Sequence, residues 1–326
     1  MFLLEKFRNL RNRYMELGFH RTVYFYMNQF FFGEQIEFNT GLFVAYWAKE
    51  RKMKRFFKND DSFWCKLNVD IEYLYENCKR GGIKFVSHDE GNQKLYFKFK
   101  KINLVTDYSV GILIQIFGLQ AYKLEKQLFK PKSRYIVIDI GMNKAFSSIW
   151  FAMRRQTDIV VGYEMNPILK SYIDENLELN PSLSSKIIVN LFGLSDKEGE
   201  VAFYSLKNDD GVGTMNEKFY IEYWSKERKS KMKKIMAKTK IASKEISKVF
   251  KKFPNHEYIL KIDVEGAEYE IFENLSKNNL LKKFDLILGE THNGMDGIKK
   301  YLEEFDLVEE NLLPGNLATF IAKKRH

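Results

Sequence analysis

The chain has 326 residues, of which 45% are hydrophobic and 15% aromatic, and its formal net charge is +10. This composition can bury a large core, which excludes disorder along the whole chain. Five prolines and 19 glycines exclude fibrous and low-complexity classes. The length predicts one large domain with an appendage, or two domains.

We expect no signal peptide at the start of the sequence. Glu5 and Lys6 place charge where a signal peptide needs its apolar segment. No run of about 18 apolar residues follows, so we expect no membrane-spanning helix. Cys65 and Cys78 have neither zinc-type nor redox spacing. A reducing, cytoplasmic location is therefore expected, with peripheral contact at the inner face of the membrane as a further option.

Residues 1–84 are rich in aromatic and basic residues and are expected to form a helical N-terminal extension. Phe7, Leu10, Tyr14 and Leu17 follow a helical period, with basic residues between them. Such a helix can pack on its own domain or on a partner protein. It can also lie on an acidic membrane face. The sequence leaves both options open.

A β-hairpin is predicted over residues 84–105, because alternating strands flank a turn at 89–92. A helix is predicted from about Tyr108 to Leu128. From residue 135 onward, short apolar runs alternate with helix-length connections, which favours a mostly parallel sheet covered on both faces. A ligand then binds beyond the carboxyl ends of the strands. The runs are Tyr135–Ile140, Ile159–Tyr163, Ile187–Phe192, Tyr258–Ile262, Phe284–Leu288, Leu307–Val308 and Ala318–Ala322.

The ends of the first two strands of this region indicate a nucleoside site. Gly141 and Ala145 are small enough to let a tight turn bring backbone N–H groups to a ligand. Glu164 ends the second strand, where a carboxylate can hold both ribose hydroxyls. Asn143 occupies the middle position at which a dinucleotide site needs a small residue, and the acid Asp139 opens the turn. This pattern favours S-adenosylmethionine over NAD.

The order of motifs resembles the FkbM family of S-adenosylmethionine-dependent methyltransferases. The resemblance covers about residues 95–322. It implies a Rossmann-like class I methyltransferase fold: an α/β, mostly parallel seven-stranded sheet with helices on both faces. The core is then about residues 135–326, inside a methyltransferase domain of residues 85–326 that includes the hairpin. The motifs are Asp139–Asn143, Glu164–Pro167, Gly193–Asp196 with Gly199, Gly211–Thr214, Lys261–Glu268 and Glu290–His292, preceded by Thr106, Asp107 and Tyr122.

The same resemblance implies which residues bind the cofactor. Gly141 and Asn143 approach its amino-acid end, and Glu164 binds the ribose. Met165 packs on adenine, with the 194–196 segment at its rim. Lys144 is unusual at its position and has to point away from a sulfonium. The expected cofactor-binding residues are Asp139, Gly141, Asn143, Glu164, Met165, Leu194, Ser195 and Asp196.

Asp263, Glu290 and His292 end the fourth and fifth strands of this region and are the expected catalytic residues. Asp263 can face the methyl group or its acceptor, or it can cap the next helix. His292, oriented by Glu290 or Asp263, is the expected base, although a hydrogen-bonded loop histidine is the alternative. Glu265 and Glu268 are interpreted as acids of a helix's first turn. Two carboxylates and one histidine on different strands are weak evidence for a metal, so no metal is assigned.

The whole net charge is located in residues 226–252, which hold twelve basic residues and two glutamates. A short strand at Lys238–Ile241 and a helix at Ser243–Phe253 are expected in this segment. The lysines can form a solvated face. The denser stretch Lys226–Lys234 can instead attract an anionic acceptor, such as a nucleotide- or lipid-linked sugar, or acidic lipid. The chain has far more Lys than Arg, which argues against nucleic-acid binding.

The function expected from the resemblance is O-methylation of a sugar, a glycan or another small hydroxylated metabolite. Two alternatives stay open: an RNA or other nucleic-acid methyltransferase, and a non-catalytic module that binds S-adenosylmethionine. Base-methylating enzymes usually carry an Asn/Asp-Pro-Pro-aromatic motif after the fourth strand. This chain has Asp263–Gly266 at that place.

Overall fold

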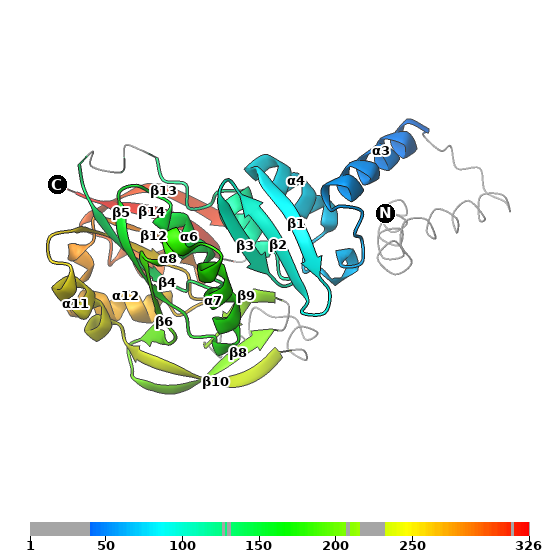
Figure 1. Cartoon of the computed structure of the whole chain (residues 1–326). Coiled ribbons are helices and arrows are strands. Elements are labelled where there is room, and N and C mark those ends of the chain that lie inside the picture. The colour runs from blue at the N-terminus through cyan, green and yellow to red at the C-terminus, as the bar shows by residue number, and fades with distance from the viewer. Residues whose placement is uncertain are drawn as a thin grey trace, which may run out of the picture. The chain divides into compact units, whose positions relative to one another are not determined.

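The computed structural model describes residues 40–125, 128, 132–206, 209–215, 232–313 and 316–325 (Figure 1). The helical pattern at residues 7–17 and the dense lysines at 226–231 lie outside these ranges. The chain divides into two compact units, Met1–Lys66 and Leu67–His326. The domain boundary expected near residue 84 stays a prediction. Within the described ranges, every helix is too short or too polar to cross a bilayer.

The described part of the first unit is helical. Helix α3 (Thr40–Phe56) is followed by the short helix η1 (Trp64–Lys66). Met53, Phe57 and Phe63 are fully buried. The rings of Phe57 and Phe63 meet edge to face with their centroids 5.7 Å apart, a geometry that aromatic pairs favour.

The second unit begins with a helix and a small antiparallel sheet. Asp70 caps helix α4 (Ile71–Gly81) by accepting a hydrogen bond from the Glu72 N–H. Strands β1 (Ile83–Asp89) and β2 (Lys94–Phe99) form the predicted hairpin, which is confirmed. Strand β3 (Ile102–Thr106) adds a third antiparallel strand beside β2.

The long helix predicted from Tyr108 to Leu128 is wrong. Between Tyr108 and Glu125, helical structure covers only α5 (Gly111–Leu113) and η2 (Ile114–Gly118). Gly118 packs closely on α4, since a Cβ there would lie 3.1 Å from the Asn77 carbonyl oxygen. Gln120 then takes a left-handed backbone conformation with φ 57°, which a continuing helix excludes. The chain turns here, and the Tyr122 ring stacks on Phe151.

The central sheet has seven strands in the order β13-β14-β12-β11-β4-β5-β6. Its first five members along the chain pair in parallel, and β14 pairs antiparallel with both β12 and β13. The seven predicted runs and the Rossmann-like fold class are confirmed. The strands are β4 (Tyr135–Ile140), β5 (Thr157–Tyr163), β6 (Ile187–Asn190), β11 (Glu257–Ile262), β12 (Leu286–Thr291), β13 (Phe305–Leu313) and β14 (Leu317–Lys324).

Helices connect these strands and cover the sheet, as Figure 1 shows. Helix α6 follows β4, and α7 and α8 follow β5. Helix α12 follows β11, and α13 lies between β12 and β13. Their bounds, with two short 3₁₀ helices, are α6 (Phe146–Ala152), η4 (Pro167–Leu169), α7 (Lys170–Glu178), α8 (Pro181–Ser184), α12 (Glu268–Lys277), η5 (Leu281–Lys283) and α13 (Asp296–Lys299).

A second sheet, in the order β7-β10-β8-β9, was not predicted. Strand β10 (Met232–Ile241) contains the expected short strand but begins six residues earlier, and α11 (Ala242–Lys252) confirms the expected helix. Strand β10 pairs antiparallel with β8 along its length and parallel with β7 at its end. Lysines at most solvent-facing positions hid this strand from the sequence pattern. The other strands are β7 (Gly193–Ser195), β8 (Gly199–Leu206) and β9 (Asp209–Thr214).

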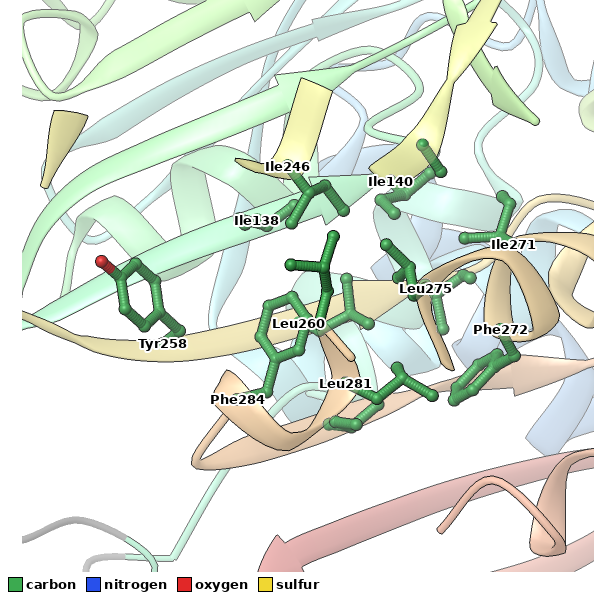
Figure 2. Close-up of a cluster of buried hydrophobic side chains, with 14 of the residues drawn as sticks. Ile138, Ile140, Ile246, Tyr258, Leu260, Ile271, Phe272, Leu275, Leu281 and Phe284 are labelled. Carbon is green, nitrogen blue, oxygen red and sulfur yellow. The ribbon is translucent and has the colours of Figure 1, made fainter. Parts of the chain in front are cut away.

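The main core lies between the central sheet and helices α11 and α12 (Figure 2). Leu260 of β11 and Ile138 of β4 are fully buried in the middle of the sheet. Ile246 of α11 and Ile271 of α12 pack in the same cluster. Burial of these side chains holds in place the two strands whose ends build the pocket described below.

Truncating Leu260 should destabilise the second unit. Leu260→Ala should lower the free energy of unfolding by about 2–5 kcal/mol, because the cavity cannot collapse within a packed sheet. Urea denaturation followed by circular dichroism measures the change. Leu312 is 74% exposed, so Leu312→Ala is the matched control and should shift stability by less than about 0.5 kcal/mol. Equal effects of the two variants would contradict the assigned core.

Candidate active site

A tight turn after β4 brings two strand ends together. Gly141 has φ +82°, and a Cβ there would lie 1.9 Å from the carbonyl oxygen of Asp263. Only glycine permits this approach. The N–H groups of Gly141 and Met142 donate to the carbonyl of Tyr163 at the end of β5. Asn143 and Ala145 also have positive φ, 51° and 69°, before α6 begins.

Glu164 connects this turn to the end of β5. Its carboxylate accepts hydrogen bonds from the backbone N–H of Asn143 at 2.9 Å and of Asn166 at 2.7 Å. Each carboxylate oxygen has a second acceptor site. Glu164 can therefore hold the turn and still accept hydrogen bonds from two ligand hydroxyls.

A pocket open to solvent lies at the carboxyl ends of β4, β5 and β11. Gly141, Asn143 and Glu164, three of the expected cofactor-binding residues, line it. Met165 and Leu194 supply apolar wall at one end. A Cβ on Gly193 would lie 3.0 Å from the Met165 Cβ, so the glycine lets Met165 pack against β7.

Among the described site residues, three expected cofactor ligands do not line this pocket. Asp139 is fully buried and accepts hydrogen bonds from the hydroxyls of Ser147 and Ser148 at 2.7 and 2.6 Å. It therefore anchors the start of α6 rather than a ligand. The Ser195 hydroxyl donates to Asp196 at 3.1 Å, and Asp196 lies beyond the pocket.

Lys144 points away from the pocket. Its fully buried ammonium donates to the Thr106 hydroxyl at 2.9 Å, to Asp107 at 2.6 Å and to the Ser109 carbonyl at 3.2 Å. It also lies 5.2 Å from the ring centroid of Tyr172. This arrangement explains why Thr106 and Asp107 precede the first motif: they neutralise and bind the buried lysine.

Sequence reasoning gave no role to Lys261, which crosses beneath the turn. Its ammonium donates to the Gly141 carbonyl at 2.6 Å and lies 3.4 Å from Asp139 and 3.9 Å from Asp263. Burial and neighbouring acids raise the pKa of Tyr122 well above its ordinary value. Its hydroxyl therefore stays protonated and donates to Asp263 at 3.2 Å. The sequence signal was that Lys261 opens the Lys261–Glu268 motif, two residues before Asp263.

Acids and a histidine gather where β11 and β12 end. His292 Nδ1 lies 2.8 Å from Glu268 Oε1, and its Nε2 lies 3.4 Å from Glu265 Oε2 and 3.9 Å from Glu290 Oε1. Asp263 and Glu265 line the pocket, and the Gln115 amide lies 3.4 Å from Glu290. The group that orients His292 is therefore Glu268, not Glu290 or Asp263 as expected. We call Asp263, Glu265, Glu290 and His292 the acceptor-side cluster.

The close packing of this cluster shifts its pKa values. Burial raises the pKa of Glu265 to about 7, against the opposing effect of His292. Burial and then the charge of Asp263 raise the pKa of Glu290 to about 7. Burial alone would lower the pKa of His292, but the charges of Glu268 and Glu265 hold it well above its ordinary value. His292 is therefore protonated near neutral pH in this arrangement and is not the free base that the sequence suggested.

The motif order, the sheet order and the pocket agree with one protein family. Residues 139–313 match the methyltransferase FkbM domain, which is more than half of the chain. The chain belongs to the FkbM methyltransferase family. It is an S-adenosylmethionine-dependent methyltransferase, as the resemblance implied. No curated protein matches it significantly.

Solved structures with a similar fold are distant in sequence. A Streptococcus agalactiae protein of the NADB-Rossmann superfamily is 16% identical, with 63% of this chain and 70% of that one covered and a TM-score of 0.35. TrmK of M. capricolum, solved with S-adenosylhomocysteine, is 12% identical over 62% and 69%, with a TM-score of 0.34. A precorrin-6y C5,15-methyltransferase from Geobacter metallireducens is 14% identical over 61% and 85%, with a TM-score of 0.31.

The residues of the FkbM-family pocket fit S-adenosylmethionine. Glu164 offers acceptors for the ribose, and Met165 and Leu194 offer an apolar surface for the base. Asp263 and Glu265 place negative charge at the other end, where a sulfonium and an ammonium group are stabilised. When bound, the cofactor supplies an electrophilic methyl group.

Replacing Glu164 should weaken cofactor binding. Glu164→Gln keeps one acceptor oxygen but loses the second and the charge, so the dissociation constant for S-adenosylmethionine should rise at least about tenfold. Isothermal titration calorimetry measures it. Asp196→Asn is the matched control, because Asp196 lies outside the pocket; its affinity should equal that of the wild type. The reverse ranking would place the ribose at Asp196 instead.

Proposed function

We propose that the chain is an O-methyltransferase that acts on a hydroxyl of a sugar, a glycan or another small hydroxylated metabolite, in the cytoplasm. The observation that supports this proposal is the acceptor-side cluster, which opens onto the cofactor pocket through Asp263 and Glu265. A hydroxyl is a poor nucleophile until it loses its proton, so its methylation benefits from a nearby base. A cluster of carboxylates is suited to that task.

Methyl transfer from a sulfonium is an in-line displacement, and the protein contributes mainly alignment and exclusion of water. Asp263 is fixed by the Tyr122 hydroxyl on one side and faces the pocket on the other. It can accept a hydrogen bond from the acceptor hydroxyl and direct the oxygen lone pair toward the methyl group. Because the Tyr122 hydroxyl stays protonated, Asp263 keeps its donor throughout.

The acceptor proton has to go to a group that titrates near the working pH. Glu265 and Glu290 are such groups, since the pKa of each is raised to about 7. His292, protonated and held by Glu268, supplies positive charge behind them. In this proposal, Glu290 takes the role first given to His292, and His292 becomes a positioning residue.

Strand β10 adds positive charge near the pocket. Ile235 pairs with Phe203, which lines the pocket, and the adjacent Lys233 and Lys234 are exposed. The Lys234 ammonium lies 5.9 Å from the ring centroid of Tyr204. We propose that these lysines attract an anionic acceptor such as a nucleotide- or lipid-linked sugar. Acidic lipid at the inner membrane face is the surface on which a lipid-linked acceptor would be met.

The function is tested by a methyl-release assay against nucleotide sugars, lipid-linked glycans and RNA. We expect methylation of a sugar hydroxyl, with the O-methyl linkage identified by mass spectrometry. Glu290→Gln should lower turnover on the order of 10²–10⁴-fold, because the proton acceptor is lost, while cofactor binding stays unchanged.

Glu303→Gln is the matched control, since Glu303 is exposed and is not part of the acceptor-side cluster; its turnover should equal that of the wild type. Methylation of RNA alone would replace the proposed function by the nucleic-acid alternative. Full turnover of Glu290→Gln would remove Glu290 as the base.

Reversing the charge of β10 should weaken acceptor binding. Lys233→Glu with Lys234→Glu should raise the KM for an anionic acceptor at low salt, and the effect should fade near physiological ionic strength as the charges are screened. Steady-state kinetics at two salt concentrations measure this. Lys244→Glu with Lys251→Glu makes the same charge change on α11 and should leave KM unaltered. Equal KM values for both double variants and the wild type would assign the lysines to a solvated face.

A further inference from the structure

The acceptor-side cluster has the ligand spacing of a metal site. Asp263, Glu265 and His292 each offer one ligand atom, and these three atoms lie within 4.8 Å of one another. Ligand atoms around a cation at about 2.1 Å are separated by about 3 Å when adjacent and about 4.2 Å when opposite. The 3.4 Å between His292 Nε2 and Glu265 Oε2 is close to the first value. A small adjustment would therefore complete the coordination.

A buried carboxylate orients the histidine as metal-bound histidines are oriented. Glu268 is fully buried and accepts hydrogen bonds from the N–H of Val264 at 3.0 Å and of Gly266 at 3.1 Å. It is thus fixed as an acceptor, so His292 Nδ1 donates to it. The ring then directs Nε2 toward Glu265. This carboxylate–histidine pair is the outer-shell arrangement that fixes the tautomer and raises the basicity of a ligating imidazole.

The backbone conformation of Glu265 directs its side chain toward His292. Its φ is 52°, in the left-handed region that a residue with a side chain occupies at a cost. An acid in the first turn of α12, as the sequence suggested, would have had helical backbone angles. Instead the side chain is only 20% exposed and meets His292. In this backbone conformation the Glu265 carboxylate lies beside that of Asp263.

We propose that Asp263, Glu265 and His292 bind a divalent cation at the acceptor end of the pocket. Carboxylates suit Mg²⁺ and Mn²⁺, whereas imidazole suits Zn²⁺ and Fe²⁺, so a mixed set favours a first-row ion such as Mn²⁺ over Ca²⁺. The cation takes the place of the His292 ring proton and lowers the repulsion among the buried acids. Glu290, 3.9 Å from His292, remains available for the acceptor proton.

This proposal deepens the proposed function. Only the catalytic role of the cation rests on that function. A cation beside Asp263 can bind the acceptor oxygen and lower the pKa of the hydroxyl, as metal ions do for bound water. Cation binding itself requires neither acceptor nor cofactor. The proposed site also differs from the one that the sequence suggested. The sequence weighed Glu290 as a ligand and placed Glu265 in the first turn of a helix.

Electron paramagnetic resonance tests the site directly. The full chain, treated with EDTA and freed of chelator, is titrated with Mn²⁺ alone, and the loss of the free-ion signal reports binding. We expect one saturable site in the wild type. Glu265→Gln should weaken binding at least about tenfold, because a charged ligand becomes a neutral one. Asp263→Asn should do the same.

Glu270→Gln is the matched control, since Glu270 lies on α12 outside the pocket and faces no ligand atom of the site. Its Mn²⁺ affinity should equal that of the wild type. The inference is overturned if the wild type shows no saturable site, or if Glu265→Gln binds as tightly as the wild type. Thermal denaturation of each variant confirms that the comparison is between folded proteins.

The outcome separates this inference from the proposed function. A chain that binds Mn²⁺ through these residues but methylates no hydroxyl refutes the function and keeps the site. A chain that methylates a hydroxyl at full rate in EDTA and binds no Mn²⁺ refutes the site and keeps the function.

Discussion

The contact between Gly141 and the carbonyl of Asp263 determines the geometry of the site. A Cβ on residue 141 would lie 1.9 Å from the carbonyl oxygen of Asp263. The turn after β4 and the end of β11 therefore meet only because residue 141 is glycine. The Lys261 ammonium of β11 stabilises the same contact by donating a hydrogen bond to the Gly141 carbonyl. The turn after β4 and the pocket-lining end of β11 are thus two sides of one backbone contact, and a shift in either moves both.

Charge is distributed around this junction in a consistent way. Of the two buried lysines nearest the turn, Lys144 points away from the pocket to Asp107, whereas Lys261 lines the pocket between Asp139, the Gly141 carbonyl and Asp263. Asp263 therefore has a lysine ammonium 3.9 Å away, whereas the nearest cationic group to Glu265 is His292 at 3.4 Å. The pocket presents negative charge at the end where a sulfonium is stabilised. Asp139, expected as a ligand, instead helps to bury Lys261.

The sequence predicted the sheet well and the polar contacts poorly, for physical reasons. Buried parallel strands leave long apolar runs, so Tyr135–Ile140 and Tyr258–Ile262 were recognised almost to the residue. Strand β10 was largely missed because its exposed lysines carry no apolar pattern. The pairing of His292 with Glu268 joins residues on different elements. No spacing rule reveals that Glu268, the later acid of the Lys261–Glu268 motif, is buried against His292. Nor does one reveal that Glu265 has a positive φ.

The acids at the acceptor end carry a cost that the fold has to offset. Burial, and to a smaller extent the repulsion from neighbouring carboxylates, raises the pKa values of Glu265 and Glu290 to about 7. The protonated His292 and the Lys261 ammonium, 3.9 Å from Asp263, compensate only part of this negative charge. The N–H groups of Val264 and Gly266 donate to Glu268 and so fix the carboxylate that orients His292, but they carry no net charge. The remaining imbalance is relieved when positive charge enters from the pocket, as a sulfonium or as a divalent cation, so ligand binding and the stability of this corner of the fold are coupled.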